Sequence, residues 1–328
     1  MSMSDALSNE QLANAYRVMR TIREFEERLH VECTTGDIPG PVHLYAGQEA
    51  VAAGVCAHLG AQDYIASTHR GHGHAIAKGC DVTAMMLEIF GKADGLCGGK
   101  GGSMHLADIK AGMLGANGIA AGGAPLACGA ALSAKLRGTD QVAVAFVGDG
   151  GANQGAFHES LNLATVWRLP CVFVIEDNGY AQSTGSSFHL GGGQDIVVRA
   201  AGFGVQAATA DGYDFFSVHG AAGAAVRRAR AGQGPSVLVF PAGRYFAHME
   251  GLDRQMYRAA GEADELRASH DCLRNFANVV TAGGRLSTGE LAAIDERARA
   301  EVDAAVAAAR AAAEPPTTAL ASDVYVSY

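Results

Sequence analysis

An aspartate and an asparagine that each follow an apolar, β-branched stretch have the chemistry to bind a divalent cation. Asp149 lies in the triplet Gly148-Asp149-Gly150 after residues 141–147, and Asn178 comes shortly after residues 171–175. A carboxylate and an amide oxygen suit a hard cation such as Mg²⁺, which also takes oxygens from a phosphate ligand. The glycines of the triplet would let the backbone turn sharply and approach that ligand. The spacing therefore favours a metal–diphosphate site over the alternative that both residues merely form turns.

The elements around these two residues would bring them to the same edge of a sheet. Residues 141–147 and 171–175 are short, apolar and rich in β-branched side chains, which is typical of strands buried on both faces. Between them, residues 154–168 place apolar side chains at helical spacing, and Pro170 ends that helix. A strand–helix–strand unit has a right-handed crossover, so the residues that follow both strands should face one crevice.

Alternating strands and helices along the rest of the chain predict the fold class. The pattern continues with expected strands at 64–67, 205–208 and 236–240, and with expected helices at 9–32, 125–132 and 287–313. Neither an internal repeat nor a linker interrupts it. We therefore expect an α/β fold with a doubly wound, mostly parallel sheet and helices on both faces, in one domain that spans residues 1–328.

Composition and charge argue against several classes of protein. The chain has 328 residues and a net charge of −9, with no basic run, which argues against a nucleic-acid partner. No stretch is long and apolar enough to cross a membrane, and residues 1–12 lack the apolar run of a signal peptide. The seven cysteines are scattered without a CxxC pair, as expected for reduced thiols. These features predict a cytoplasmic protein with no membrane partner.

Five blocks that span most of the chain resemble one enzyme family. They are HLYAGQEA (43–50), STHRGHGH (67–74), KGGSMH (100–105), GDGGANQG (148–155) and RYFAH (244–248). In this order they resemble the alpha subunit of the decarboxylating component of 2-oxo acid dehydrogenase complexes, which has the thiamine-diphosphate-binding fold. Within that family the acetoin dehydrogenase alpha subunits are most similar, because of residues 68–74, 113–118 and 244–248.

The resemblance implies which residues bind the cofactors, thiamine diphosphate and Mg²⁺. Asp149 and Asn178 would bind Mg²⁺ through their side chains, and Tyr180 through its backbone carbonyl. The other implied cofactor contacts are Arg70, Gly150 and Gly151 at the phosphates, and His69, Gly118 and Ala120 at or near the rings. An arginine suits a phosphate because its planar guanidinium donates two hydrogen bonds at once, although a surface ion pair is its commoner role.

Histidines of two blocks match residues that are catalytic in this family. His248 matches the histidine that lies over the diphosphate and the reacting carbon, where an imidazole can donate to the diphosphate or transfer a proton. His43 matches a residue at the substrate entrance. The roles of His72 and His74 stay open: beside His69 on an extended segment they could bind Zn²⁺, or they pack as hydrogen-bonded side chains. The segment has no carboxylate or cysteine, which argues against zinc.

The resemblance also implies the reaction and the partners. An acetoin dehydrogenase cleaves the acyloin acetoin, releases acetaldehyde, and passes the remaining hydroxyethyl unit as an acetyl group to a lipoyl acyltransferase. Pyruvate or a branched-chain 2-oxo acid is the alternative substrate. The glutamate that activates the cofactor lies on a second domain, for which this chain has no room, and Glu49 is expected to be structural. A beta subunit should therefore complete the site, in a tetramer of two alpha and two beta chains.

A few positions depart from the family pattern. Asp177 replaces a second asparagine, Ala247 replaces a glycine, and Leu252 is inserted before Asp253. The last two lie in the loop of His248, where they bear on which substrates the enzyme accepts. Met249 replaces the serine that is regulated in mitochondrial pyruvate enzymes, and kinase control is therefore not expected there. A dinucleotide-binding or purely structural α/β protein is the remote alternative, although no GxGxxG motif opens a helix directly after a strand.

Overall fold

A parallel six-stranded sheet forms the centre of the computed structural model, which describes residues 7–191, 195–252, 256–323 and 325. The strands lie in the order β2-β1-β3-β4-β8-β7, and each neighbouring pair is parallel. They are β1 (Tyr64–Ala66), β2 (Met113–Gly115), β3 (Ala143–Gly148), β4 (Cys171–Asp177), β7 (Gln206–Thr209) and β8 (Ser236–Pro241). A separate antiparallel hairpin consists of β5 (Tyr180–Ala181) and β6 (Thr184–Gly185). The predicted α/β class is confirmed.

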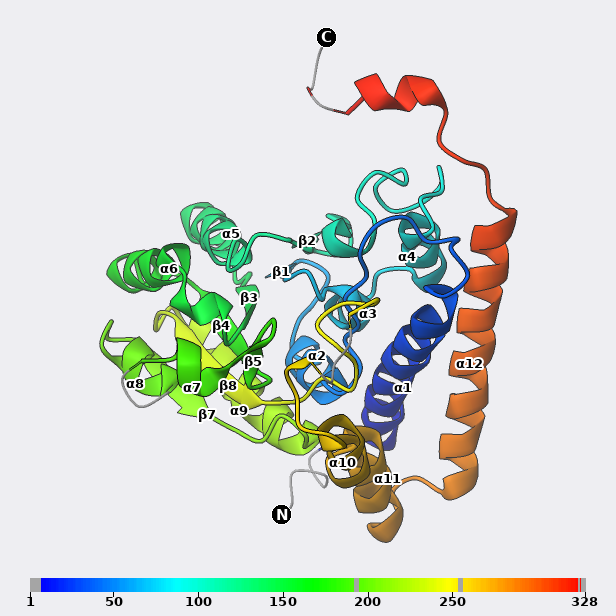
Figure 1. Cartoon of the computed structure of the whole chain (residues 1–328). Coiled ribbons are helices and arrows are strands. Elements are labelled where there is room, and N and C mark those ends of the chain that lie inside the picture. Colours follow the sequence, from blue (N-terminus) through cyan, green and yellow to red (C-terminus); the bar gives the residue numbers. More distant parts are fainter. Residues whose placement is uncertain (1–6, 192–194, 253–255, 324, 326–328) are drawn as a thin grey trace.

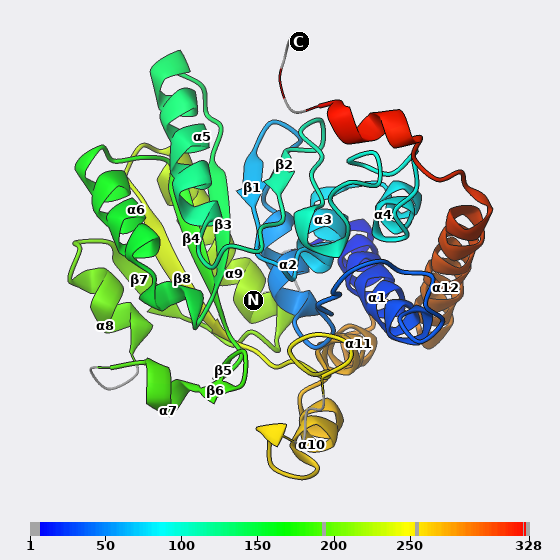
Figure 2. The ribbon, with the colours of Figure 1, turned by 45° about the horizontal axis from the view of Figure 1, so that its top comes forward.

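Helices cover both faces of this sheet (Figure 1, Figure 2). One face packs against α5 (Gly123–Arg137), α6 (Gly155–Val166) and α8 (Ile196–Ala201), and the other against α2 (Glu49–Cys56), α3 (His72–Lys78) and α9 (Phe215–Arg230). Alternate residues of β3 point to opposite faces, so Ala145 packs in the first layer and Phe146 in the second. Burial on both faces explains why this strand is apolar throughout.

An outer layer of helices packs beyond the second face. The long helices α1 (Asn9–Glu32) and α12 (Thr288–Ala311) lie side by side (Figure 1), with α4 (Val82–Ile89) near one end and α11 (Cys272–Ala282) near the other. Both long helices begin with a capping box, in which a serine and the residue three positions later exchange side-chain-to-backbone hydrogen bonds. The shorter helical segments are η2 (Ser103–His105), η3 (Gly151–Asn153), α7 (Ser186–His189), α10 (Glu262–Ser269) and η5 (Thr317–Ala321).

The strand order places several loops at one edge of the sheet. The chain places β2 on one side of β1, and the later strands lie on the other side in the spatial order β3, β4, β8 and β7, so the order reverses between β1 and β3. At such a reversal, the loops after neighbouring strands diverge and leave a crevice for a ligand. The register pairs Gly148 with Glu176, and Glu176 with Phe240. The loops after β3, β4 and β8 therefore start level with one another.

Some local boundaries differ from those expected from the sequence. α6 is shorter than the expected helix at 154–168, because Gly151–Asn153 form a 3₁₀ turn before it and Arg168 has a φ of 47° after it. The small-residue helix expected at 125–132 is longer, since α5 ends only where Gly138 adopts a left-handed conformation. His72 and His74 belong to α3 and not to an extended segment.

The composition predicts that no helix crosses a membrane and that the cysteines are reduced thiols. None of the helices in the described ranges is long and apolar enough to cross a membrane. All seven cysteines are free thiols, and most are buried. Cys56 and Cys171, for example, pack in the apolar layers on either face of the sheet, as small hydrophobic side chains do.

Candidate active site

A cavity of about 410 Å³ opens where the loops diverge at the carboxyl edge of the sheet. The residues that line it include each one predicted for the site: His43, His69, Arg70, Gly118, Ala120, Asp149, Gly150, Gly151, Asn178, Tyr180 and His248. They come from the loops after β1, β3, β4 and β8, from the segment before α2 and from the segment before α5. The fold thus brings all of them together, although their individual roles stay predictions.

Asp149 and Asn178 each keep a buried side-chain oxygen without a hydrogen bond. Asp149 Oδ2 has no hydrogen-bond partner among the described residues. Asn178 donates through Nδ2 to Gln48 Oε1 at 3.2 Å, and its Oδ1 is likewise unpaired there. An unpaired buried polar atom costs roughly 1–3 kcal/mol, so these oxygens fit a cation that would coordinate both. The Tyr180 hydroxyl donates to Glu262 Oε2 at 2.9 Å, which leaves its backbone carbonyl as the predicted ligand.

His189 lies beside Asp149, although no motif in the sequence points to it. Its Nε2 lies 3.2 Å from Asp149 Oδ2, within ion-pair distance, yet neither atom makes a hydrogen bond with suitable angles to a described residue. Its Nδ1 lies 3.2 Å from Nδ2 of Asn153, whose Oδ1 accepts from Arg199 Nη1 at 2.7 Å. His189 follows no strand end and belongs to no recognisable motif. Only the folding of α7 over the loop after β3 brings it to the carboxylate.

The glycines after Asp149 leave room that a larger residue would fill. A Cβ atom on Gly150 would lie 2.6 Å from Ala181 Cβ, and one on Gly151 would lie 2.9 Å from Val147 Cγ1. Real Cβ atoms do not approach so closely, so both positions require glycine. Their backbone therefore borders the cavity without side chains in between, which suits the close approach of a phosphate group.

Arg70 lies in the cavity wall, but its guanidinium is already bound to the protein. Nη1 donates to the Leu44 carbonyl, and Nη2 donates to the His248 carbonyl at 2.9 Å. Burial, followed by the neighbouring charge of Arg244, lowers the pKa of Arg70 to about 9, so it is still a cation at neutral pH. The side chain thus holds two loops together and contributes positive charge to the cavity. These two bonds use two of the five guanidinium N–H groups, and the predicted contact with a phosphate stays a prediction.

The imidazoles of His43, His69 and His248 form a cluster in the cavity wall. Their ring centroids are 4.6 to 5.1 Å apart, and one nitrogen from each lies within 4.8 Å of the others. Burial, followed by the charge of Arg70, lowers the pKa of His43 and of His248 to about 3 and that of His69 to about 2. All are therefore neutral near pH 7. The adjacent arginine charge disfavours a metal dication here and favours ligands with negative oxygens.

His72 and His74, whose roles were open, lie away from that cluster and are completely buried in α3. His72 Nδ1 lies 3.0 Å from Glu26 Oε1, and its Nε2 lies 2.9 Å from Ser103 Oγ. His74 Nδ1 lies 2.7 Å from Ser67 Oγ, and its Nε2 lies 3.1 Å from Glu176 Oε1. Both nitrogens of each ring are thus used within the protein, and the pair packs as hydrogen-bonded core residues and does not form a zinc site with His69.

The structure also distinguishes the two glutamates near the site. Glu49 is completely buried, and its Oε1 lies 2.5 Å from Nε of Arg23, which agrees with the structural role expected for it. Glu176 is the one glutamate among the described residues that line the cavity. Its Oε1 accepts hydrogen bonds from the Tyr45 hydroxyl and from His74. No motif in the sequence points to Glu176, which lies between the expected strand at 171–175 and Asn178.

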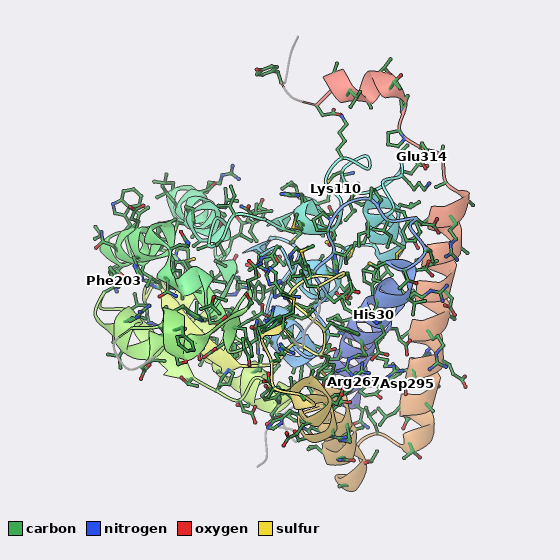
Figure 3. All side chains as sticks on the ribbon, viewed as in Figure 1. His30, Lys110, Phe203, Arg267, Asp295 and Glu314 are labelled. Atoms are coloured by element: carbon green, nitrogen blue, oxygen red, sulfur yellow. The ribbon has the colours of Figure 1, made fainter. Side chains whose placement is uncertain are left out.

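The residues that depart from the family pattern lie mostly on the outer side of the loop after β8. Ala247, Met249 and Leu252 line a second hollow of about 570 Å³, which His30 of α1 and Arg267 of α10 also border (Figure 3). None of these three lines the first cavity. Their side chains therefore do not shape that cavity directly. Asp253, before which Leu252 is inserted, lies outside the described residues.

The affinity for Mg²⁺ is expected to fall as the pH drops through about 6. Burial, followed by the nearby Asp177 carboxylate, raises the pKa of Asp149 from 3.8 to about 6. The cation binds the carboxylate and not the acid, so below that pKa its affinity should fall about tenfold per pH unit. The increase in unfolding midpoint caused by Mg²⁺ should be larger at about pH 7.5 than at about pH 5, with Na⁺ at equal ionic strength as control. An equal increase at both pH values would contradict this assignment.

Comparisons with known proteins show which family the chain belongs to. Residues 17–318 match the family model described as dehydrogenase E1 component. The chain is 57% identical to the alpha subunit of acetoin:2,6-dichlorophenolindophenol oxidoreductase from Cupriavidus necator, over 98% of this chain and 96% of that protein. It is 48% identical to the protein of the same name from Bacillus subtilis, with the same coverage. It is 39% identical to the pyruvate dehydrogenase E1 component subunit alpha of Zymomonas mobilis, over 97% of this chain and 89% of that protein.

Proposed function

We propose that this chain, which belongs to the dehydrogenase E1 component family, is the alpha subunit of a thiamine-diphosphate-dependent enzyme that cleaves acetoin to acetaldehyde. The remaining two-carbon unit is oxidised and passed to a lipoyl acyltransferase. The observation that carries the choice of substrate is the 57% identity to an acetoin oxidoreductase alpha subunit over nearly the full length, against 39% for a pyruvate dehydrogenase alpha subunit. The chain itself is an oxidoreductase component, as its family is.

The cofactor pair that we assign to the cavity is thiamine diphosphate with Mg²⁺. When bound, thiamine diphosphate supplies a nucleophilic carbon and an electron sink for cleaving a bond next to a carbonyl. Asp149, Asn178 and the Tyr180 carbonyl would hold the cation, and the unpaired oxygens of the first two support this. Gly150 and Gly151 let the diphosphate approach their backbone, and Arg70 adds positive charge beside it.

The remaining residues of the cavity would hold the rings of the cofactor and the substrate. Gly118 and Ala120 line the wall at positions where backbone groups can meet the aminopyrimidine ring. His43, His69 and His248 are neutral, so they can donate hydrogen bonds to the hydroxyl and carbonyl oxygens of an acyloin without adding charge. We assign His248 and His43 to catalysis and His69 to a cofactor contact.

We further propose that a beta subunit completes the site, in a tetramer of two alpha and two beta chains. The relatives named above are themselves designated alpha subunits. The activating glutamate would come from that partner, because Glu176 is held by Tyr45 and His74. The free thiols of all seven cysteines support a reducing compartment, and we assign the enzyme to the cytoplasm.

Activity of the reconstituted pair on acetoin and on pyruvate, measured in parallel, tests the choice of substrate. We expect kcat/KM for acetoin to exceed that for pyruvate by at least about 100-fold, because the wrong group at a buried polar site leaves hydrogen-bonding atoms unpaired. Reduction of an artificial electron acceptor gives the rate without the lipoyl partner. A preference for pyruvate or for a branched-chain 2-oxo acid would assign the chain to the other branch of the family.

A further inference from the structure

Arg244 contacts the ring of the predicted catalytic histidine from inside the protein. It follows β8, is only 1% exposed, and is the largest of the fully buried side chains among the described residues. Its Nη1 lies 3.2 Å from Nδ1 of His248, and its Nη2 donates to the Gln182 carbonyl at 3.0 Å. The Arg244 carbonyl in turn accepts from Arg258 Nη1 at 2.7 Å. Gln182 therefore holds the guanidinium of Arg244, and Arg258 holds its backbone, independently of His248.

This contact determines which nitrogen of His248 carries the proton. A guanidinium has only donors, so His248 Nδ1 must accept, and it can accept only when it bears no hydrogen. Burial, followed by Arg70 and Arg244, lowers the pKa of the ring to about 3, so it is neutral and has one N–H. Burial lowers the pKa of Arg244 only to about 10, and it remains a cation at neutral pH. The single hydrogen of the imidazole is therefore on Nε2.

The backbone of His248 is held as firmly as its ring. Arg70 Nη2 donates to the His248 carbonyl at 2.9 Å, so two arginines fix the residue from different sides. The His248 ring also packs against the rings of His43 and His69, whose centroids are 4.8 and 5.1 Å away. Within the described part of the chain, no side chain engages Nε2 in a hydrogen bond, which leaves this N–H for a ligand in the cavity.

We propose that Arg244 is a positioning residue that fixes His248 as the Nε2–H tautomer, so that His248 acts on the acyloin as a hydrogen-bond donor and not as a base. The catalytic part of this proposal rests on the proposed function, whereas the tautomer does not. A neutral imidazole whose lone pair is occupied by a guanidinium cannot accept a proton from the substrate. It can stabilise negative charge that develops on a substrate oxygen, as a preorganised donor does.

Nitrogen NMR of the cofactor-free, full-length chain with ¹⁵N-labelled histidine tests the tautomer directly. The His248 signals are assigned by their loss in His248→Gln. We expect an unprotonated Nδ1 and a protonated Nε2 at neutral pH. In Arg244→Met, which removes the donor but keeps the length of the side chain, the two nitrogens should move toward averaged values as both tautomers become populated. A protonated Nδ1 in the unaltered chain, or an unchanged pattern in Arg244→Met, would overturn the proposal.

Two further variants separate this role from a general effect on the loop. Arg244→Lys keeps a side chain that can only donate, and should largely retain the Nε2–H tautomer. Arg267→Gln removes an exposed arginine that lies over the Tyr245 and Phe246 rings of the same loop but does not contact His248. It should leave the His248 signals unchanged. If Arg267→Gln averaged the tautomers as Arg244→Met does, the effect would belong to the loop and the proposal would be wrong.

Kinetics of the assembled enzyme tests the consequence for catalysis. Arg244→Met should lower kcat for acetoin on the order of 10- to 100-fold, somewhat less than the loss of an entire oxyanion donor. The KM for acetoin should change little, and Arg244→Lys should restore much of kcat. Cofactor affinity is measured separately by calorimetry. A normal kcat once Arg244→Met is saturated with cofactor would disprove the catalytic part, whereas a failure of the unaltered enzyme to use acyloins would disprove only the proposed function.

Discussion

Asp149→Asn is expected to abolish Mg²⁺-dependent binding of thiamine diphosphate and, at the same time, to stabilise the cofactor-free fold. The substitution removes the charged ligand of the predicted metal site, and the affinity should fall by at least about 100-fold. It also removes a carboxylate that burial makes unfavourable to ionise, since its pKa is raised from 3.8 to about 6. At pH 7 that difference corresponds to at most about 3 kcal/mol of folding free energy.

The sign of the stability effect follows from the direction of the pKa shift. Because the folded chain binds the proton of Asp149 more tightly than the unfolded chain, the cofactor-free fold loses stability as the pH rises from about 4 to about 6. Asparagine does not titrate, so its advantage should be present above about pH 6 and vanish below about pH 4. Chemical unfolding at these pH values measures it, and calorimetry measures cofactor affinity.

Asp177→Asn is the matched control for this experiment. Asp177 is an acid at the end of β4 whose charge acts on Asp149, but it does not line the cavity, and its Oδ1 accepts from the Gly179 backbone N–H at 3.1 Å. Cofactor affinity should stay within a few-fold of that of the unaltered chain. If Asp149→Asn left the affinity unchanged, or if Asp177→Asn reduced it equally, Asp149 would not be the metal ligand.

The purified chain by itself is expected to show almost no turnover of acetoin, and addition of its beta subunit should raise the rate by roughly 10²- to 10⁴-fold. A positioned general acid or base usually accelerates a reaction by about this factor. The physical reason is that Glu176, the one glutamate among the described residues of the cavity wall, is bound by Tyr45 and His74. The measurement is the rate of acetoin-dependent reduction of a dye before and after mixing.

Glu176→Gln in the assembled enzyme shows whether this chain holds the activating carboxylate after all. A glutamine can still accept the hydrogen bond from the Tyr45 hydroxyl, so the fold should be retained and the activity should change only a few-fold. Abolished activity in a correctly assembled tetramer would make Glu176 the activating group. Full activity of the unaltered chain without a beta subunit would refute the dependence on a partner.

The fold and the composition of the cavity wall follow largely from local features of the sequence. The β3–α6–β4 unit is recognisable because its strands are apolar on both faces and its helix has the proper spacing. Asp149 and Asn178 are predictable because polar residues directly after parallel strands must meet at one edge. The histidines of the cavity, such as His43 and His248, could be named only by resemblance, since nothing local distinguishes them from surface residues.

Pairwise contacts between distant segments could not be predicted in the same way. Arg70 belongs to a block that resembles a phosphate site, and nothing in that block predicts that its guanidinium also binds the carbonyls of Leu44 and His248. His72 and His74 look like metal ligands in sequence, but α3 buries them against carboxylates from other elements. Each of these contacts depends on how loops and helices pack, and side-chain partners far apart in the chain have no local signature.

Local patterns in the sequence are enough to predict the class of fold and the sheet edge that carries Asp149 and Asn178, because strand periodicity and residues at strand ends act over short distances. The family follows from the resemblance of five sequence blocks and not from periodicity. The arrangement of charge and protons within the site, by contrast, depends on how the chain packs. Burial raises the pKa of Asp149 and lowers that of His248, and the closed packing after β8 sets Arg244 against the His248 ring. These effects depend on exclusion of water and on through-space distance, which only the packed chain defines.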